Sequence, residues 1–195
     1  QYTNCKKIIN IGSCQEYSLK NGKCKEHHDT NSYDFFSLSK NTIREYLTYK
    51  CIKLKISLIW LRPFYIYGPY QRKESLIPST IFKCKTSKRI SINNSNVKLD
   101  FVHVYDVCNA INKFISYKDD IVETFNVGYG KSILVDKVVN KISKNYDGIK
   151  KIYNKNNTLI SNINFYSDNS KIKKYINWSP KITIDQGIKK IIYFK

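Results

Sequence analysis

The sequence has 195 residues, of which 42% are hydrophobic, enough to bury the core of one sizeable domain. It carries 34 Lys and Arg residues against 15 Asp and Glu residues, a formal net charge of +19. A charge of this size permits nucleic-acid binding, but it is spread along the chain without an RNA- or DNA-binding motif, so we expect no specific nucleic-acid partner. No apolar stretch approaches the roughly 18 residues of a membrane span, and no signal-peptide pattern is present, which predicts a cytoplasmic protein without a membrane anchor.

The hydrophobic pattern predicts alternating strands and helices, as in an α/β protein. Strands are expected at residues 7–11, 55–61, 99–102 and 123–127. Helices are expected at residues 38–50, 77–85, 104–117, 135–145, 167–176 and 184–193. A long loop is expected at residues 15–33, and one short strand with a loop within residues 145–164.

The six cysteines show no C-x-x-C pair and no Cys/His cluster at zinc spacing, which indicates thiols in a reducing compartment and no metal site. His27 and His28 lie in a polar stretch, where a pair of loop histidines is more often solvated than bound to a metal. The sequence contains no Met and begins with Gln1. We therefore expect an N-terminally incomplete chain.

Five ordered segments carry recognisable patterns. Residues 62–69 read R-P-F-Y-I-Y-G-P directly after a buried strand, the place where open α/β sheets bind ligands. Residues 99–107 read L-D-F-V-H-V-Y-D-V. The other three are a Ser four residues before a Tyr at 13–17, F-S-L-S-K at 36–40, and N-V-G-Y-G at 126–130. A further match, N-W-S-P-K, follows late in the chain at 177–181.

In this order the segments resemble the NAD-dependent epimerase/dehydratase family, the extended short-chain dehydrogenases that modify nucleotide sugars. That family reads R-P-x-N-x-Y-G-P and R-D-F-V-H-V-x-D-V in the two longest segments. The resemblance implies the later part of a Rossmann-type doubly wound parallel sheet with a smaller C-terminal substrate-binding lobe. Residues 1–69 and 99–130 would form the partial NAD(P)-binding domain, and residues 70–98 and 131–195 the nucleotide-sugar lobe. It also implies a homodimer in the full-length protein.

The resemblance places the catalytic positions at Ser13, Phe36 and Lys40. In the family a Tyr exchanges a proton with a sugar oxygen, a Lys one turn later holds the nicotinamide ribose and lowers the Tyr pKa, and a Ser or Thr binds the same oxygen. Phe36 replaces that Tyr and has no proton to give, so weak or absent turnover is expected. Tyr33 is the nearest substitute, but on a helix it would lie about 10.5 Å along the axis from Lys40, against about 6 Å for the usual spacing.

The implied cofactor is NAD or NADP, bound at Gly12, Ser13, Lys40, Pro63 and Tyr65. The sequence has no G-x-x-G-x-x-G turn for the pyrophosphate, so we expect incomplete cofactor binding. Tyr65 and Tyr67 are expected to line one cleft with the catalytic positions.

The implied nucleotide-sugar contacts are Tyr65, Leu76, Ile77, Arg72, Arg89 and Lys98. The family's Arg in R-D-F is Leu99 in this chain. Arg72, Arg89 or Lys98 would then have to supply the charge that faces the diphosphate.

Three classes of function stay open. The first is an NAD(P)-dependent nucleotide-sugar epimerase, dehydratase or reductase that transfers a hydride at a sugar carbon. The second is a catalytically inactive relic or binding module with the same fold. The third is a basic nucleic-acid-binding protein. Upstream coding sequence for a G-x-x-G-x-x-G turn would favour the enzyme, and a start or stop codon there would favour the relic.

Overall fold

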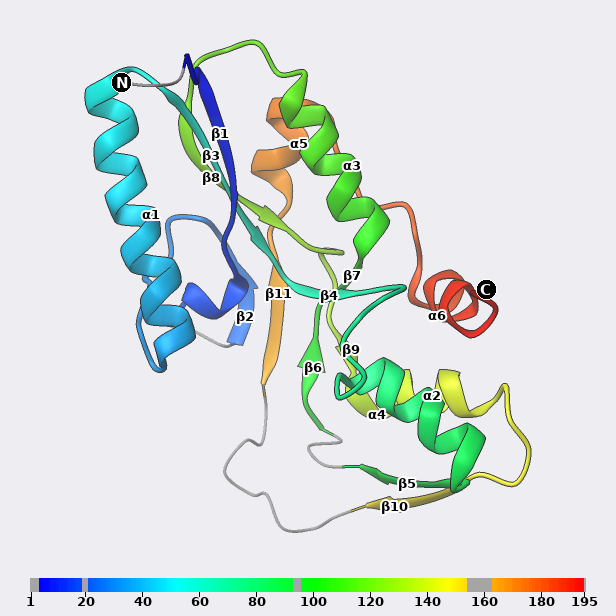
Figure 1. Ribbon diagram of the computed structural model, residues 1–195. Helices are drawn as coiled ribbons and strands as arrows, with labels where there is room; N and C mark the ends of the chain where they lie inside the picture. The colour runs from blue at the N-terminus through cyan, green and yellow to red at the C-terminus, as the bar shows by residue number, and fades with distance from the viewer. Residues whose placement is uncertain (1–3, 19–20, 93–95, 154–162, 195) are drawn as a thin grey trace.

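The computed structural model describes residues 4–18, 21–92, 96–153 and 163–194 (Figure 1). Its central sheet has three parallel strands in the order β1 (Lys7–Ile11), β3 (Ser57–Pro63) and β8 (Val122–Val127). In the register, Ile9 lies opposite Ile59. Every residue of β3 is buried, as expected for a mostly apolar central strand of a parallel sheet. The parallel pairing of the first two expected strands is confirmed.

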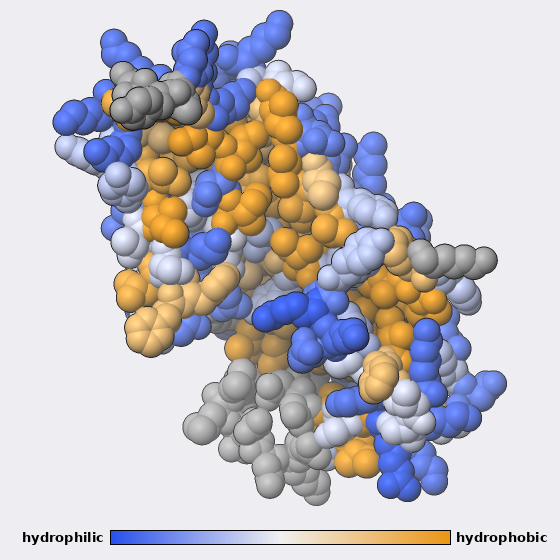
Figure 2. All heavy atoms as spheres, in the orientation of Figure 1, coloured by the Kyte–Doolittle hydropathy of each residue, from blue (hydrophilic) through white to orange (hydrophobic). Residues whose placement is uncertain are grey.

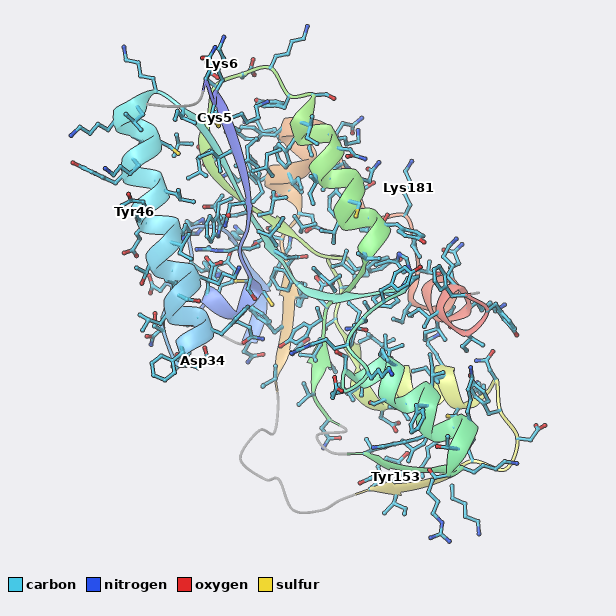
Figure 3. All side chains as sticks on the ribbon, viewed as in Figure 1. Cys5, Lys6, Asp34, Tyr46, Tyr153 and Lys181 are labelled. Atoms are coloured by element: carbon cyan, nitrogen blue, oxygen red, sulfur yellow. The ribbon has the colours of Figure 1, made fainter. Side chains whose placement is uncertain are left out.

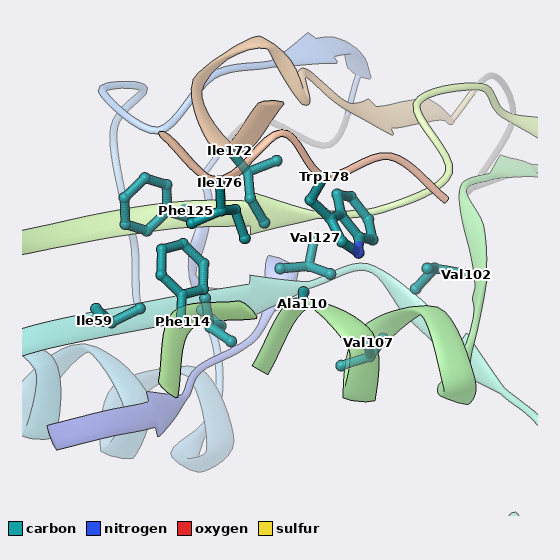
Figure 4. Packing of buried hydrophobic residues seen from close by; sticks show 11 residues of the cluster. Ile59, Val102, Val107, Ala110, Phe114, Phe125, Val127, Ile172, Ile176 and Trp178 are labelled. Atoms are coloured by element: carbon teal, nitrogen blue, oxygen red, sulfur yellow. The ribbon is translucent and has the colours of Figure 1, made fainter. Parts of the chain in front are cut away.

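Helices cover both faces of this sheet. Helix α1 (Phe35–Leu54) lies on one face, and α3 (Val104–Ile115) and α5 (Ser170–Ile176) lie on the other (Figure 1). The first core fills the space between α3, α5 and the sheet, where the rings of Phe114 and Phe125 have centroids 4.7 Å apart. Figure 4 shows Ile59, Ala110 and Trp178 around this pair. The layering is that of a Rossmann-type α/β protein, as the sequence predicts.

The segment expected to be a long loop, residues 15–33, contains regular structure. The 3-10 helix η1 (Cys14–Glu16) follows β1, and β2 (Asn21–Cys24) pairs in parallel with β11 (Asn164–Ser167). Strand β11 also pairs with β6 (Lys98–Leu99), which pairs with the antiparallel β9 (Ile133–Leu134). The sequence of β2 is Asn-Gly-Lys-Cys, which gives no strand signal, so its pairing depends on a partner far along the chain.

The single strand expected at residues 99–102 is divided in two. Strand β6 ends at Leu99, and β7 (Phe101–His103) pairs in parallel with β4 (Tyr65–Tyr67). Asp100 lies between them, fully buried, and its carboxylate binds backbone groups of a neighbouring turn. At Asp100 the chain passes from the sheet that contains β6 to the strand pair β4–β7.

A second core lies in the lower part of Figure 1. It is built by α2 (Leu76–Thr86), β5 (Arg89–Ile92), α4 (Val135–Ser143) and α6 (Ile184–Ile192), with β10 (Lys150–Tyr153) paired to β5. All six expected helices are therefore present, and they begin or end within a few residues of the expected bounds. Part of the stretch 145–164, residues 154–162, lies outside the described residues.

The two cores do not follow the expected domain division at every point. Ile172 and Trp178 belong to the stretch 131–195 that the resemblance assigns to the sugar lobe, yet both pack in the first core against the central sheet. The division into a cofactor domain and a sugar lobe stays a prediction.

Strand β1 lies at the edge of the central sheet, and among the described residues β3 is its only strand partner. Figure 2 shows apolar side chains gathered between α1 and α3, where β1 runs. Ile11, at the end of the strand, is exposed. Strands of parallel sheets are normally buried on both faces. Strand β1 therefore resembles an internal strand of a larger sheet rather than a protected edge strand.

Within the described part of the chain, no helix has the length and apolarity that crossing a membrane requires. Nor do the described residues contain a group of three or more His, Cys, Asp or Glu side chains placed to hold a metal ion.

Candidate functional site

A tight turn connects β1 to η1 and carries Ser13. The N–H of Gly12 donates to the carbonyl of Leu61 on the neighbouring strand, 2.7 Å away. Ser13 caps η1, and its Oγ accepts a hydrogen bond from the N–H of Gln15 (3.1 Å). A hydroxyl that accepts one hydrogen bond can still donate its own proton to another group. The turn therefore presents Ser13 as a donor at the carboxyl end of the sheet.

Helix α1 brings Lys40 to the same place. Asp34 caps the helix through a reciprocal pair of hydrogen bonds with Ser37, which fixes where the helix begins. Lys40, one turn after Phe36, donates from its Nζ to the carbonyl of Ile11 (2.9 Å), two residues before Ser13. The same ammonium lies 5.8 Å from the centroid of the Phe36 ring. The structure thus brings Lys40 and Phe36 to the turn that carries Ser13.

The Phe36 ring is 51% exposed, so a ligand can reach it, but it has no proton to transfer. Tyr33, the possible substitute, precedes α1 and is exposed. Its hydroxyl donates to the carbonyl of Ser18 (3.0 Å) and is therefore held on the loop.

The aromatic turn after β3 contributes one of its two tyrosines to this region. Tyr65 accepts a hydrogen bond from Gln15 Nε2 (3.3 Å), which places its hydroxyl beside the Ser13 turn. Burial raises the pKa of Tyr65 to about 12, so it stays protonated at neutral pH. Tyr67 does not line this cleft: it is buried in the second core, and its hydroxyl donates to the carbonyl of Thr183 (3.2 Å). The expectation for Tyr67 is wrong, because its side chain packs towards α6.

The residues expected to contact the nucleotide sugar are dispersed. Ile77 is buried in the second core, where its side chain packs against other apolar groups, and Leu76 is partly buried beside it. Arg72, Arg89 and Lys98 have no ion-pair partner among the described residues. Strand β5, which begins at Arg89, lies at the bottom of Figure 1, below the sheet that contains β1 and β3.

A cavity of about 400 Å³ that the sequence reasoning missed lies between β9, α4 and the start of α6. Its apolar walls include Phe101, Ile133 and Ile184, and its cationic groups are Lys131, Lys137 and Lys141. The ring of Phe101 also lies 6.0 Å from that of Tyr65, so this wall connects the cavity to the Ser13 region. The available signals were the position of Lys131 after a glycine turn and the helical spacing of the other two lysines.

The cavity is lined by more positive than negative side chains, with three lysines against Asp185. Lys141 forms an ion pair with Asp185 at 2.7 Å. Lys131 and Lys137 have no hydrogen-bond or ion-pair partner within the part of the chain that the structure describes. An anionic group of a ligand would therefore meet two uncompensated ammonium groups there.

The two aspartates of the segment 99–107 hold backbone in place. The carboxylate of Asp100 accepts hydrogen bonds from the N–H groups of Tyr129 (2.6 Å) and Gly130 (3.0 Å), and from both the N–H and the hydroxyl of Ser167. Burial raises the pKa of Asp100, and the four donated hydrogen bonds oppose that rise. These contacts fix the glycine turn that leads into the cavity.

Asp106 also holds backbone N–H groups, at the other end of the segment. Its carboxylate accepts hydrogen bonds from the N–H groups of Lys181 and Ile182, both at 3.0 Å, and its carbonyl accepts one from the indole of Trp178. His103, which lies between these two aspartates in the sequence, is fully buried. It caps α3 by accepting a hydrogen bond from the N–H of Tyr105 (3.2 Å). The pattern of residues 99–107 is thus structural.

A parallel sheet with helices on both faces, and a Ser turn that meets a Lys-bearing helix at its carboxyl end, define a Rossmann-type α/β protein. A sequence model described as the NAD dependent epimerase/dehydratase family matches residues 1–128. The match covers 128 of 195 residues, and the chain belongs to this family.

Two curated proteins match most of the chain. An uncharacterized protein of Methanocaldococcus jannaschii is 31% identical over 143 residues, which cover 69% of this chain and 41% of that protein. CDP-abequose synthase of Salmonella muenchen is 27% identical over 188 residues, 89% of this chain and 60% of the synthase. The chain thus spans about half the length of these curated relatives.

Two solved structures share the fold. RMD from Pseudomonas aeruginosa, complexed with NADPH, superposes with a TM-score of 0.85 at 17% identity and covers 96% of this chain and 65% of its own. UDP-glucose 4-epimerase from Thermotoga maritima, with UDP-glucose, has a TM-score of 0.85 at 20% identity, covering 97% of this chain and 63% of its own.

Proposed function

We propose that this chain is the sugar-binding portion of an NAD(P)-dependent enzyme that transfers a hydride at a carbon of a nucleotide sugar, as an epimerase, dehydratase or reductase. The observation that carries the proposal is the hydrogen bond from Lys40 to the carbonyl of Ile11, which joins α1 to the Ser13 turn. NADPH in the Pseudomonas structure and UDP-glucose in the Thermotoga structure support the choice of cofactor and substrate.

The residues present fit the nicotinamide end of the cofactor. Lys40 already donates to a carbonyl oxygen and can donate its other two protons to the hydroxyls of a ribose. Gly12 lies in the same turn, Tyr65 contacts it through Gln15, and Pro63 ends the neighbouring strand β3; these residues complete the proposed contacts. When bound, a nicotinamide supplies or accepts the hydride.

On the substrate side, the hydroxyl of Ser13 donates to the reacting sugar oxygen. The family's tyrosine would exchange the proton there, and Phe36 cannot. We therefore propose that the chain turns over slowly or not at all, and that Tyr33 is the first residue to test as another proton donor. The inactive relic or binding module remains the alternative, and Phe36 is the residue that favours it.

The nucleotide part of the substrate fits the cavity between β9, α4 and α6. Its volume, about 400 Å³, falls in the range of small-ligand sites. Lys131 and Lys137 supply the positive charge that Leu99 cannot, and Phe101 supplies an aromatic wall for a planar base. Arg72, Arg89 and Lys98 do not line this cavity, and contacts of these residues with the substrate stay a prediction.

The uncovered edge of β1 supports a further part of the proposal. An additional parallel strand with its glycine-rich turn would pair with β1 and cover the apolar side chains seen in Figure 2. That strand would belong to the half of the fold that binds the cofactor pyrophosphate, so cofactor binding by these 195 residues alone would be weak.

We also propose a homodimer, because the outward face of α1 carries several large apolar side chains, with Thr42, Glu45 and Lys53 among them. Its inward face carries Ser37, Asn41 and Cys51, all buried. Its outward face carries large exposed side chains, namely Phe35, Leu38, Tyr46, Tyr49 and Ile52. Figure 3 shows Tyr46 pointing away from the sheet. A helix whose apolar side faces water needs a partner surface, and a second copy of α1 provides a matching one.

The dimer is tested by sedimentation of the unmodified chain and of Tyr46→Glu. We expect a dimer for the unmodified chain and a shift to monomer for the variant. Phe82→Glu, which changes another exposed aromatic residue on α2, is the control and should leave the dimer intact. A monomer at all concentrations would contradict the assignment of this surface.

The function is tested by calorimetric titration with NAD(H) and NADP(H), followed by assays with UDP-, GDP-, CDP- and dTDP-hexoses. Binding of a nucleotide sugar that is lost in Lys131→Glu combined with Lys137→Glu supports the proposal. Binding of a hexose nucleotide without turnover favours the binding module. Tight binding of RNA or DNA with a steep salt dependence, and none of nucleotide sugars, would favour the basic nucleic-acid-binding protein.

Cytoplasmic location stays part of the proposal. Cys5, Cys51, Cys84 and Cys108 carry free thiols, which suits a reducing compartment.

A further inference from the structure

We propose that Glu16 is a positioning residue that fixes the Ser13 hydroxyl for its ligand, an inference that rests on the proposed function of the Ser13 turn. Glu16 is fully buried, and it lies three residues after Ser13 in η1. A carboxylate is rarely buried in this way unless its oxygens are paired. Each of its two oxygens has identifiable partners.

Oε1 of Glu16 serves the turn itself. It accepts a hydrogen bond from the N–H of Ser13 (2.7 Å) and another from the indole Nε1 of Trp60 (3.0 Å). Trp60 is a fully buried residue of the central strand β3. Through this oxygen, the position of Ser13 is tied to the sheet rather than to the loop that follows.

Oε2 of Glu16 forms ion pairs with two arginines. It accepts from Nε of Arg62 (2.8 Å), whose side chain is 2% exposed, and lies 3.5 Å from Nε of Arg44 on α1. The guanidinium of Arg62 stacks 4.4 Å from the ring centroid of Tyr17, and the hydroxyl of Tyr17 donates to Asn126 on β8 (2.7 Å). The carboxylate thus joins η1, α1 and β3 directly, and β8 through Tyr17.

The turn that carries the Ser13 hydroxyl is held on two sides. Lys40 holds the carbonyl of Ile11 on one side of the turn, and Glu16 holds the N–H of Ser13 on the other. Oγ accepts from the N–H of Gln15, and the hydroxyl proton is left to donate to a ligand. A donor fixed in this way needs no reorganisation when a ligand oxygen arrives, which is what electrostatic preorganisation requires.

The first test measures the turn without any ligand. Glu16→Gln keeps the shape of the side chain and removes its charge. We expect hydrogen exchange of the Ser13 amide to accelerate at least about 10-fold, because its charged acceptor is lost. The indole N–H resonance of Trp60 should move, while that of Trp178, which donates to the Asp106 carbonyl, serves as the internal control. An unchanged Ser13 amide would overturn the proposal.

The second test uses UDP-glucose as the probe and compares two backgrounds. We expect Glu16→Gln to weaken binding about 3- to 10-fold when Ser13 is present, the effect of one hydrogen bond. In Ser13→Ala the same change should have no further effect, because a positioning residue acts through Ser13. Equal weakening in both backgrounds would show a merely structural role and overturn the proposal.

The two tests separate the failure of this inference from the failure of the proposed function. If the unmodified chain does not bind UDP-glucose, that substrate is wrong, and exchange at the Ser13 amide still decides the role of Glu16. If Glu16→Gln does not fold, Trp60→Phe removes the indole donor that Oε1 and Oε2 share (3.0 and 3.2 Å) and keeps the ion pair with Arg62. The same two measurements then apply to that variant.

Discussion

The Nζ of Lys40 donates a hydrogen bond to the carbonyl of Ile11, 2.9 Å away, and so joins the first turns of α1 to the last residue of β1. Ser13 and Phe36 are brought to the same place by this contact, although they lie on different elements. The proposed proton-transfer site depends on this arrangement, and the side chain at position 36 has no proton to give to it.

Phe36→Tyr should restore that proton. Once the cofactor-binding half is supplied, we expect turnover of a nucleotide sugar to rise by about 10²–10⁴, the usual contribution of a positioned acid or base. Phe35→Tyr, one residue earlier and 90% exposed, is the matched control and should give no increase. Steady-state assays of both variants check the prediction, which fails if the unmodified protein already turns over at the restored rate.

Asp100→Asn should destabilise the fold by about 2–4 kcal/mol. Both oxygens of Asp100 face N–H donors, from Tyr129 on one side and from Gly130 and Ser167 on the other. An amide group in either orientation would place its NH₂ against a donor. Urea unfolding measures the loss, and Asp147→Asn, at an exposed position, should change the free energy of unfolding little. Equal stabilities of the two variants would contradict this account.

Gly12→Ala should cost about 3 kcal/mol of stability, because the added Cβ would overlap Oε1 of Glu16 and the indole nitrogen of Trp60. Both neighbours are fully buried and cannot move away freely. Gly22→Ala provides the comparison: nothing lies within 4 Å of its Cβ position, and only its φ of +82° is unfavourable. We expect that variant to lose about 1 kcal/mol. Thermal and urea unfolding of the pair would reveal the difference.

Stability should fall as the pH drops below about 6.5, partly through His103. Burial lowers the pKa of His103; nearby Asp106 opposes this shift and Lys190 adds to it. The folded state therefore holds the neutral ring, while the unfolded state takes up a proton near the ordinary histidine pKa. The unfolded state then binds more protons, and acidification favours it.

The measurement is the melting temperature of the unmodified chain and of His103→Asn between pH 5 and 8. Asn keeps an oxygen that can accept from the N–H of Tyr105 at the start of α3. We expect the difference between the two proteins to shrink as the pH falls. Parallel curves would show that His103 does not titrate across this range.

The sequence alone was sufficient for the α/β class, for the parallel pairing of β1 with β3, and for all six helices. The α/β class and the helices depend on patterns within a short window: continuous apolar strands, helical periodicity and the turn after β3. The parallel pairing was expected from the family resemblance. The resemblance in five ordered motifs pointed to the epimerase/dehydratase family, which the family match confirms. It also identified Lys40 and Ser13, whose roles stay proposals.

Tertiary structure alone decided the remaining features, because each depends on a partner far along the chain. Strand β2 has no apolar pattern and exists through its pairing with β11, more than a hundred residues later. Tyr67 and Tyr65 lie on the same short strand, yet one packs towards α6 and the other towards Gln15. A sequence window contains neither partner. The role of Glu16 could not be predicted from the sequence for the same reason. Its burial depends on hydrogen bonds from Arg62 and Trp60, which lie on β3.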